Sequence, residues 1–346
     1  MLAFGNIVVF HPAAIGDALL ASPIAATLKL NYPAAKLTYW THPGLRNILL
    51  GLCPSIDEIV DYDREASIFQ QVKTFDAFKS DLFVDLANSF KSNSMTLMTR
   101  SKVLRYEKQP PDQLPRMHAV ENFINTIRPV CPEIPEKLFP SIFPEALSEE
   151  VVQRLFGEQH LHRAPMIAIV PGVGKHRPHR AWLYEGWQYL LQTILSWGTH
   201  QPILIGGEDE VDLAERLNND LDSRCINACG RLSLSETAAV LKACAVAISG
   251  DTGPAHMAVA VGTPVLGLYG ATYPERSGPY GYLDYVLDQS ASCECHGMKC
   301  CRFSNLQEPG RCMQRIMLAE VLEKLALMGF GKPEEPEYVE DPTSLL

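Results

Sequence analysis

The stretch VAISGDTGPAHMAVA, residues 246–260, joins an apolar run to a second apolar run through a short polar segment. Gly253 removes side-chain bulk where the chain turns, and Pro254 suits a first helical turn because no amide donor is needed there. The pattern predicts a strand over 246–251 followed by a helix over 253–262. The segment is more polar than a turn requires, which indicates a functional site.

The same alternation of strand, polar turn and helix recurs along the whole chain. A segment rich in Pro and Glu, residues 129–150, separates two such series. We expect an α/β fold of two doubly wound, Rossmann-like domains that face each other across a cleft. The predicted N-terminal domain is 1–155, the C-terminal domain is 160–325, and an acidic tail covers 326–346. The expected strands are 6–10, 36–41, 81–87, 165–172, the start of 201–210, 246–251 and 264–270. The expected helices are 18–33, 185–198, 210–220, 233–245, 253–262 and 315–330.

Composition excludes several classes of protein. The chain of 346 residues has 47% hydrophobic residues and a formal net charge of −10. The negative charge argues against a nucleic-acid binder, which would carry a basic surface. No apolar run approaches the length of about 18 residues that spans a bilayer, and the N-terminus reads as a strand instead of a signal peptide. We therefore expect a cytoplasmic protein whose ten cysteines are mostly reduced.

The opening stretch has the features of a phosphate site. Strand ends that lead into helices bind ligands in open α/β sheets, and the unpaired amides of a helix start attract anions. Thr252 and His256 would add donors to the amides that follow Gly253. Asp251 suits a role in capping the helix or orienting Thr252. An ordinary helix cap beside a core histidine is the alternative.

A basic loop, PGVGKHRPHRAW at 171–182, follows another predicted strand and is suited to clamp a diphosphate. Near the N-terminus, HPAAIGDALL at 11–20 places Asp17 just past the first strand. A helix cap is the alternative role of this carboxylate. The chain contains neither G-x-G-x-x-G nor G-x-x-x-x-G-K-[ST], so the sequence does not favour a dinucleotide site or a P-loop.

Five segments together carry a resemblance to a known family, and they follow its order from about residue 5 to residue 325. The chain resembles glycosyltransferase family 9, the ADP-heptose:lipopolysaccharide heptosyltransferases. The segments are IGDALLASPIAATLKLNYPAAKLTY (15–39), DLANSFKS (85–92), HRAWLYEGW (179–187), LIGGEDE (204–210) and SGDTGPAHMAVAVGTPVLGLYGATYPERSGPYG (249–281).

The resemblance implies a GT-B fold and an inverting transfer that needs no metal or cofactor for catalysis. Asp17 matches the family's proposed catalytic base. Arg180 stands where the family has a lysine of the diphosphate clamp, and Lys175 could share that role. Glu208 matches the carboxylate that binds the nucleotide ribose, with Asp209 or Glu210 as alternatives. Leu232 matches a position beside the adenine. The remaining donor-site residues implied are Asp251, Thr252, Gly253, Pro254 and His256.

The acceptor is expected to be an anionic glycolipid bound by the N-terminal domain. Six basic residues against two acidic ones lie between Lys91 and Arg116, and such a surplus attracts acidic saccharides or headgroups. Lys91 and Ser92 resemble the family's Lys-Ser motif near the acceptor. Arg105 belongs to the basic surplus, and Gly16 lets the backbone approach closely. Peripheral contact with the inner face of the cytoplasmic membrane follows from such an acceptor. A solvated helix surface is the alternative explanation of the charge.

Half of the cysteines lie in one short segment, CECHGMKCCRFSNLQEPGRC. Four thiolates could hold a structural zinc or iron ion there. Reduced thiols without a metal, or disulfides formed after purification, are the alternatives. The candidate ligands are Cys293, Cys295, Cys300, Cys301 and Cys312.

Other functions fit the same architecture. A hydrolysing sugar-nucleotide epimerase would share the phosphate site but would need no acceptor surface. A transferase with a different nucleotide-sugar donor, or a non-catalytic protein that binds nucleotide-sugars, would share the scaffold.

Overall fold

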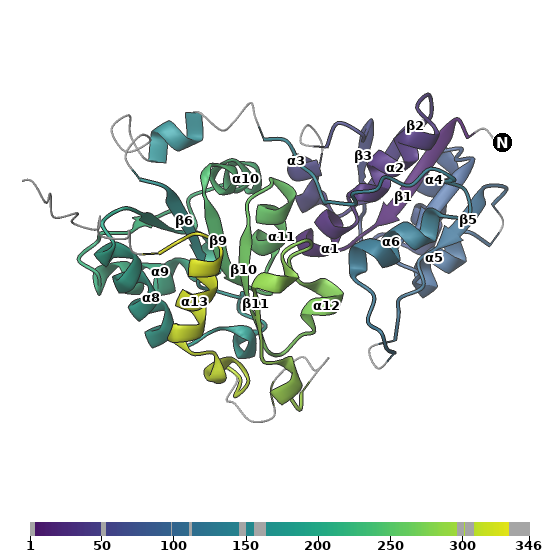
Figure 1. Ribbon diagram of the computed structural model, residues 1–346. Coiled ribbons are helices and arrows are strands. Elements are labelled where there is room, and N and C mark those ends of the chain that lie inside the picture. Colours follow the sequence, from purple (N-terminus) through teal and green to yellow (C-terminus); the bar gives the residue numbers. More distant parts are fainter. Residues whose placement is uncertain are drawn as a thin grey trace, which may run out of the picture.

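The computed structural model describes residues 4–49, 53–97, 99–110, 113–144, 150–155, 164–295, 301 and 308–331. Each half of the chain builds one parallel sheet with helices on both faces, and the two halves sit side by side (Figure 1). The predicted fold class, two doubly wound domains facing across a cleft, is therefore confirmed. No helix of the described residues is long and apolar enough to cross a membrane.

The N-terminal sheet has the strand order β3-β2-β1-β4-β5. Alternate side chains of β1 enter different cores: Ile7 and Val9 pack on one face of the sheet, Val8 and Phe10 on the other. The strands are β1 (Asn6–His11), β2 (Lys36–Thr41), β3 (Glu58–Asp61), β4 (Leu82–Asp85) and β5 (Lys102–Arg105).

Helices cover both faces of this sheet. α1 and α2 pack against α6 on one face, and α4 packs against α5 on the other. Their bounds are α1 (Ile15–Leu20), α2 (Pro23–Asn31), α3 (Arg46–Leu49), α4 (Ile68–Ala77), α5 (Phe90–Met95) and α6 (Ala119–Ile127).

The C-terminal sheet has the order β11-β10-β9-β6-β7-β8, the arrangement of a dinucleotide-binding sheet. Strands β6, β9 and β10 are almost fully buried, as expected for parallel strands covered on both faces. The strands are β6 (Met166–Val170), β7 (Gln201–Leu204), β8 (Ile226–Asn227), β9 (Val246–Gly250), β10 (Val265–Tyr269) and β11 (Val286–Asp288).

Side chains of α8 and α13 pack with one face of this sheet, and those of α10 and α11 pack with the other. The helices of this half are α8 (Tyr184–Ser196), α9 (Val211–Asn219), α10 (Leu234–Ala243), α11 (Gly253–Ala260), α12 (Pro274–Ser277) and α13 (Leu318–Leu327).

The two domains meet through α1 and α11, which face each other at the junction (Figure 1). The approach is close: a Cβ built on Gly253 would lie 2.6 Å from Cγ2 of Ile15. One buried apolar cluster continues through α1 and α2 into α10 and α11. The segment that links the domains adds a backbone hydrogen bond of 2.9 Å, from Ile142 N–H to the Ala260 carbonyl. The junction therefore fixes the position of the two sheets relative to each other.

The structure departs from the expected elements at several points, and helices α3 to α6 and α12 are among the elements that were not expected. The predicted helix 18–33 starts earlier, at Ile15, and is broken at Ala21–Ser22 into α1 and α2. Strands β3, β5, β8 and β11 were not expected, because they are short and partly exposed and so lack an apolar run. The tail predicted from residue 326 begins within α13, and residues 332–346 lie outside the described part. The domain boundaries near residue 155 stay a prediction.

Candidate active site

A cleft of about 1,510 Å³ separates the two sheets. Its walls are the segments that follow the carboxyl ends of β1, β4 and β5 in one domain and of β6, β7, β9 and β10 in the other. Both sheets reverse their strand order here, between β1 and β4 and between β6 and β9. Such a switch point leaves an open crevice at the carboxyl edge of the sheet.

Asp17 lies in the first turn of α1 and lines the cleft. It is not the helix cap, since that position is taken by Ala14, which makes no side-chain capping bond. No hydrogen bond or ion pair engages the Asp17 carboxylate among the described residues. Gly16 precedes it and also lines the cleft. The carboxylate is thus available to a ligand, as a general base requires.

The loop between β9 and α11 is held by a buried ion pair. Arg180 Nη1 lies 2.6 Å from Asp251 Oδ2, and their side chains are only 16% and 13% exposed. Of the two roles considered for Asp251, capping the helix is wrong, and orienting the loop stays a prediction. Thr252 is the N-cap, and its hydroxyl accepts from the Ala255 amide at 3.4 Å. Asp251 instead fixes Arg180 against the start of α11, with Pro254 in the first turn as expected.

Two buried histidines flank Asp17. Burial lowers the pKa of His11 to about 4, opposed by the charge of Asp17. Burial also lowers the pKa of His256, against the pull of Asp251 and Asp17. His256 packs on Gly16, where an added Cβ would lie 2.8 Å from its Cδ2, and its Nδ1 has no partner among the described residues. Both rings are therefore neutral near pH 7.

The remaining donor-site candidates are spread along the C-terminal edge. Lys175 lines the cleft and forms an exposed ion pair of 2.6 Å with Asp209. Glu208 is not among the lining residues, whereas Asp209 and Glu210 are. The Glu210 carboxylate accepts from the amides of Gly174 and Gly207 at 2.9 Å each, so it shapes the loops.

The adenine-side candidate, Leu232, is half-buried and packs on the core that both domains share. Leu234, two residues further on, lines the cleft instead.

Three acceptor candidates lie away from the cleft lining. Ser92 is fully buried and completes the capping box of α5 with Ser89, so the structure gives it a different role from acceptor contact. The Lys91 ammonium donates to the Arg64 carbonyl at 2.9 Å. The Arg105 guanidinium donates to the side chains of Asn93 and Thr96. Of the acceptor candidates, Gly16 alone lines the cleft.

Sequence reasoning gave no individual role to three cleft cations. Lys108 and Arg116 were only part of the basic surplus, and Arg276 stands within one of the family-like segments without an assigned role. All three line the cleft. The Arg116 guanidinium stacks 3.5 Å from the ring centre of Tyr273, across the domain boundary. Arg276 lies in the segment that follows the carboxyl end of β10, and this position could have indicated that it lines the cleft.

Several sequence-predicted cysteines lie near the carboxyl end of β10, where a Cβ built on Gly270 would lie 2.9 Å from Cys312 Sγ. A Cβ built on Gly310 would lie 3.5 Å from Cys312 Sγ and 3.8 Å from Cys301 Sγ. Burial and the neighbouring Cys293 raise the pKa of the Cys312 thiol to about 12. Cys295 is buried nearby, and its amide donates to Cys293 Sγ at 3.4 Å. Cys300 lies outside the described residues, which as placed hold no metal-binding group of three.

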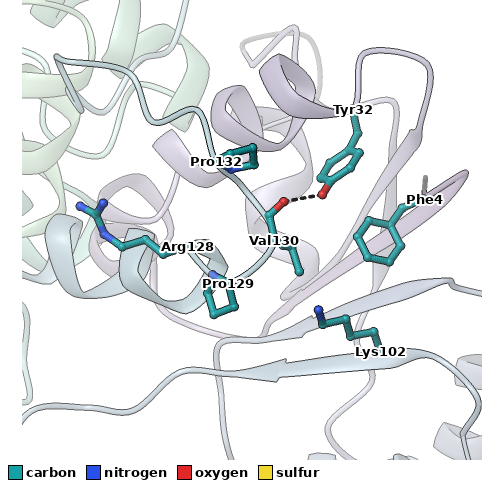
Figure 2. Close-up of a pocket in the computed structure, with 7 residues that line it drawn as sticks. All are labelled: Phe4, Tyr32, Lys102, Arg128, Pro129, Val130 and Pro132. Atoms are coloured by element: carbon teal, nitrogen blue, oxygen red, sulfur yellow. Dashed lines mark hydrogen bonds between the residues drawn. The ribbon is translucent and has the colours of Figure 1, made fainter. Parts of the chain in front are cut away.

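A second cavity, of about 250 Å³, opens on the N-terminal domain (Figure 2). Phe4 and Lys102 place it at the amino ends of β1 and β5, the edge opposite the cleft. The Tyr32 hydroxyl donates to the Val130 carbonyl within it. The cavity contains no carboxylate or histidine, so the acid–base groups gather in the cleft alone among the described cavities.

Comparison with known proteins identifies the family. The sequence model of glycosyltransferase family 9 (heptosyltransferase) matches residues 70–306. The chain belongs to this family. It is similar to lipooligosaccharide heptosyltransferase 2 of Haemophilus influenzae, with 22% identity over 299 residues, 79% of this chain and 86% of that protein. The protein is therefore a glycosyltransferase.

Solved structures share the fold. The ADP-heptose lipopolysaccharide heptosyltransferase II of Escherichia coli aligns with a TM-score of 0.73 at 19% identity, covering 93% of this chain and 98% of that one. TibC, an iron-containing dodecameric glycosyltransferase of enterotoxigenic E. coli, aligns with a TM-score of 0.58 at 15% identity, covering 95% and 77%. These likenesses establish the two-domain fold of the family 9 enzyme.

The buried ion pair of this glycosyltransferase can be tested by two matched substitutions. Asp251→Asn leaves the Arg180 guanidinium nearly buried without a countercharge, and we expect the free energy of unfolding to fall by about 3 kcal/mol. Asp209→Asn breaks an ion pair of the same length, 2.6 Å, whose partners are 72% and 36% exposed, so it should change stability little. Urea unfolding followed by tryptophan fluorescence measures both. Equal effects of the two substitutions would contradict the analysis.

Proposed function

We propose that the enzyme transfers heptose from ADP-heptose to an inner-core lipopolysaccharide acceptor, with inversion at the anomeric carbon. The donor is suggested by the names of the structural relatives and the acceptor by the names of the sequence relatives. The observation that carries the proposal is the Asp17 carboxylate, which has no hydrogen bond or ion pair within the described part of the chain and lies opposite the start of α11 in one cleft.

In the proposed mechanism, Asp17 accepts the proton of the acceptor hydroxyl as that oxygen attacks the anomeric carbon. The bond to the diphosphate breaks on the opposite face of the sugar, and negative charge grows on the leaving oxygens. Arg180, the Thr252 hydroxyl and the amides at the start of α11 would receive that charge. His256 adds an imidazole to the same end of the cleft. These groups stabilise the leaving diphosphate without a catalytic metal step.

Substitution of the base tests the mechanism. Asp17→Asn removes the proton acceptor but keeps the side-chain shape, so turnover should fall by about a thousandfold. The affinity for ADP should stay within about twofold, because the nucleotide groups lie in the other domain. Release of ADP from ADP-heptose in the presence of deacylated acceptor measures the first quantity, and calorimetric titration with ADP measures the second. Undiminished turnover would remove Asp17 from the mechanism.

We further propose a cytoplasmic enzyme that binds the inner face of the membrane through α5. Phe90, the first residue of this helix, and Leu97, two residues past its end, are 87% and 82% exposed. The stretch 86–106 contains no Asp or Glu, whereas Lys91, Arg100 and Arg105 are exposed on it. Exposed apolar side chains among cations suit an anionic bilayer surface.

Vesicle binding tests this surface. The protein should sediment with vesicles that contain phosphatidylglycerol and much less with pure phosphatidylcholine, and added salt should release it. The double substitution Phe90→Ser and Leu97→Ser should reduce binding severalfold. Leu327→Ser, which removes an exposed leucine from α13 of the other domain, is the control. Equal sedimentation of all variants would contradict the role of α5.

We also propose a structural zinc or iron ion at Cys293, Cys301 and Cys312, since thiolates are preferred ligands of both. The support is the proximity of these thiols, although the described residues as placed form no metal-binding group of three. TibC, whose fold this chain shares, is an iron-containing glycosyltransferase. Elemental analysis of the purified enzyme should find about one ion per chain, and Cys312→Ser should reduce that content. Cys244→Ser, at a buried cysteine of α10's C-cap, should not. Absence of zinc and iron from protein purified without chelators would contradict the site.

A further inference from the structure

Two cations from different domains line the cleft together with Asp17. Lys108 follows β5 of the N-terminal domain, and Arg276 lies in α12, which follows β10 of the C-terminal domain. Neither side chain has a hydrogen bond or a carboxylate within 4.0 Å among the described residues. The cleft therefore brings together two like charges, neither of which forms an ion pair among the described residues, and the charge of Asp17 acts on Lys108 from a longer distance.

The positive charges of Arg276 and Lys108 repel each other, and this repulsion affects the pKa of Lys108. Burial and the positive charge of Arg276 lower the pKa of the Lys108 ammonium, and the charge of Asp17 opposes this. The charge of Arg276 also lowers the pKa of the neighbouring Tyr106 hydroxyl, whereas burial and the charge of Asp17 raise it. Like charges in a partly desolvated cleft raise the free energy of the empty site. An anion placed between them would remove that penalty.

Arg116 adds a third positive charge at this end of the cleft. Its guanidinium stacks on Tyr273, its Nε is buried and has no hydrogen-bond partner among the described residues, and the Glu275 carboxylate lies 4.0 Å from its Nη1. Stacking on a ring from the other domain holds Arg116 in place without neutralising it. The local charge beside Asp17 is thus positive, although the chain as a whole is negative.

We propose that Lys108 and Arg276 form a two-domain clamp for an oxyanion of the acceptor, a carboxylate or phosphate carried close to the reacting hydroxyl. The clamp rests on the proposed function, since it assigns the acidic group of that acceptor to named residues. The leaving diphosphate of the donor has its own groups after β6 and β9, whereas Lys108 belongs to the opposite domain. Because the clamp needs a cation from each domain, binding of the acceptor anion favours the approach of the domains.

Binding can be measured apart from catalysis. The enzyme is saturated with ADP and titrated calorimetrically with a deacylated acidic saccharide from lipopolysaccharide core. We expect Arg276→Gln and Lys108→Gln each to weaken saccharide binding by about tenfold or more. The double substitution should weaken it by less than the product, because the two charges are coupled. Lys73→Gln, at an exposed lysine of α4, is the charge-matched control and should bind like the unmodified enzyme.

The source of the oxyanion is tested with two treated saccharides. Reduction of the carboxyl groups, or removal of the phosphates, should abolish the difference between the unmodified enzyme and Arg276→Gln for whichever group the clamp holds. ADP affinity, measured on each variant, reports both on folding and on the donor site.

Three results would overturn the clamp: no saccharide binding by the unmodified enzyme, equal binding by all variants, or a loss of ADP affinity that matches the loss of saccharide affinity. Failure of heptose transfer with the clamp effects intact would count against the proposed function alone.

Discussion

Two helix starts from different domains pack directly against each other, and the geometry of the cleft depends on this contact. Gly16 at the start of α1 meets His256, and Gly253 at the start of α11 meets Ile15. A side chain at either glycine would force the domains apart, so each position constrains the other. Asp17 follows one glycine and Thr252 precedes the other. The contact that joins the domains therefore also sets the spacing between the proposed base and the phosphate site.

An ion pair explains why an aspartate can occupy a loop that is suited to phosphate binding. Asp251 is not directed at the ligand space alone, because its carboxylate pairs with Arg180 from the loop after β6. The pair ties two segments of the switch point together. Arginine has five N–H donors in a fixed plane, so a guanidinium that is paired on one side still has donors for a second oxyanion. Asp251 thus holds Arg180 in position without consuming its binding capacity.

The elements that could be predicted are those with a clear local sequence pattern. Buried strands such as β6, β9 and β10 have continuous apolar sequences, as buried parallel strands do. The sequence Thr252–Gly253–Pro254 is typical of the start of a helix. Short half-exposed strands such as β3 and β5 carry no such run. Asp251 could not be interpreted locally, since its partner lies 71 residues away. The acceptor role of Ser92 stays a prediction, because a capping serine and a ligand-binding serine follow the same local pattern. The proposed clamp cations Lys108 and Arg276 line the same cleft only in the folded chain.

Paired and unpaired cations give the two ends of the cleft different affinities for anions. Arg180 already has a countercharge, so a diphosphate that binds there gains less Coulomb energy from it. A larger share of the binding would then come from the amides at the start of α11 and from the Thr252 hydroxyl. Such a site can stabilise a leaving group and still release the product nucleotide. Lys108 and Arg276 repel each other in the empty cleft, and an anion relieves that repulsion as it binds. In the proposed clamp, an acidic acceptor would gain free energy by relieving this repulsion, and a neutral acceptor would not.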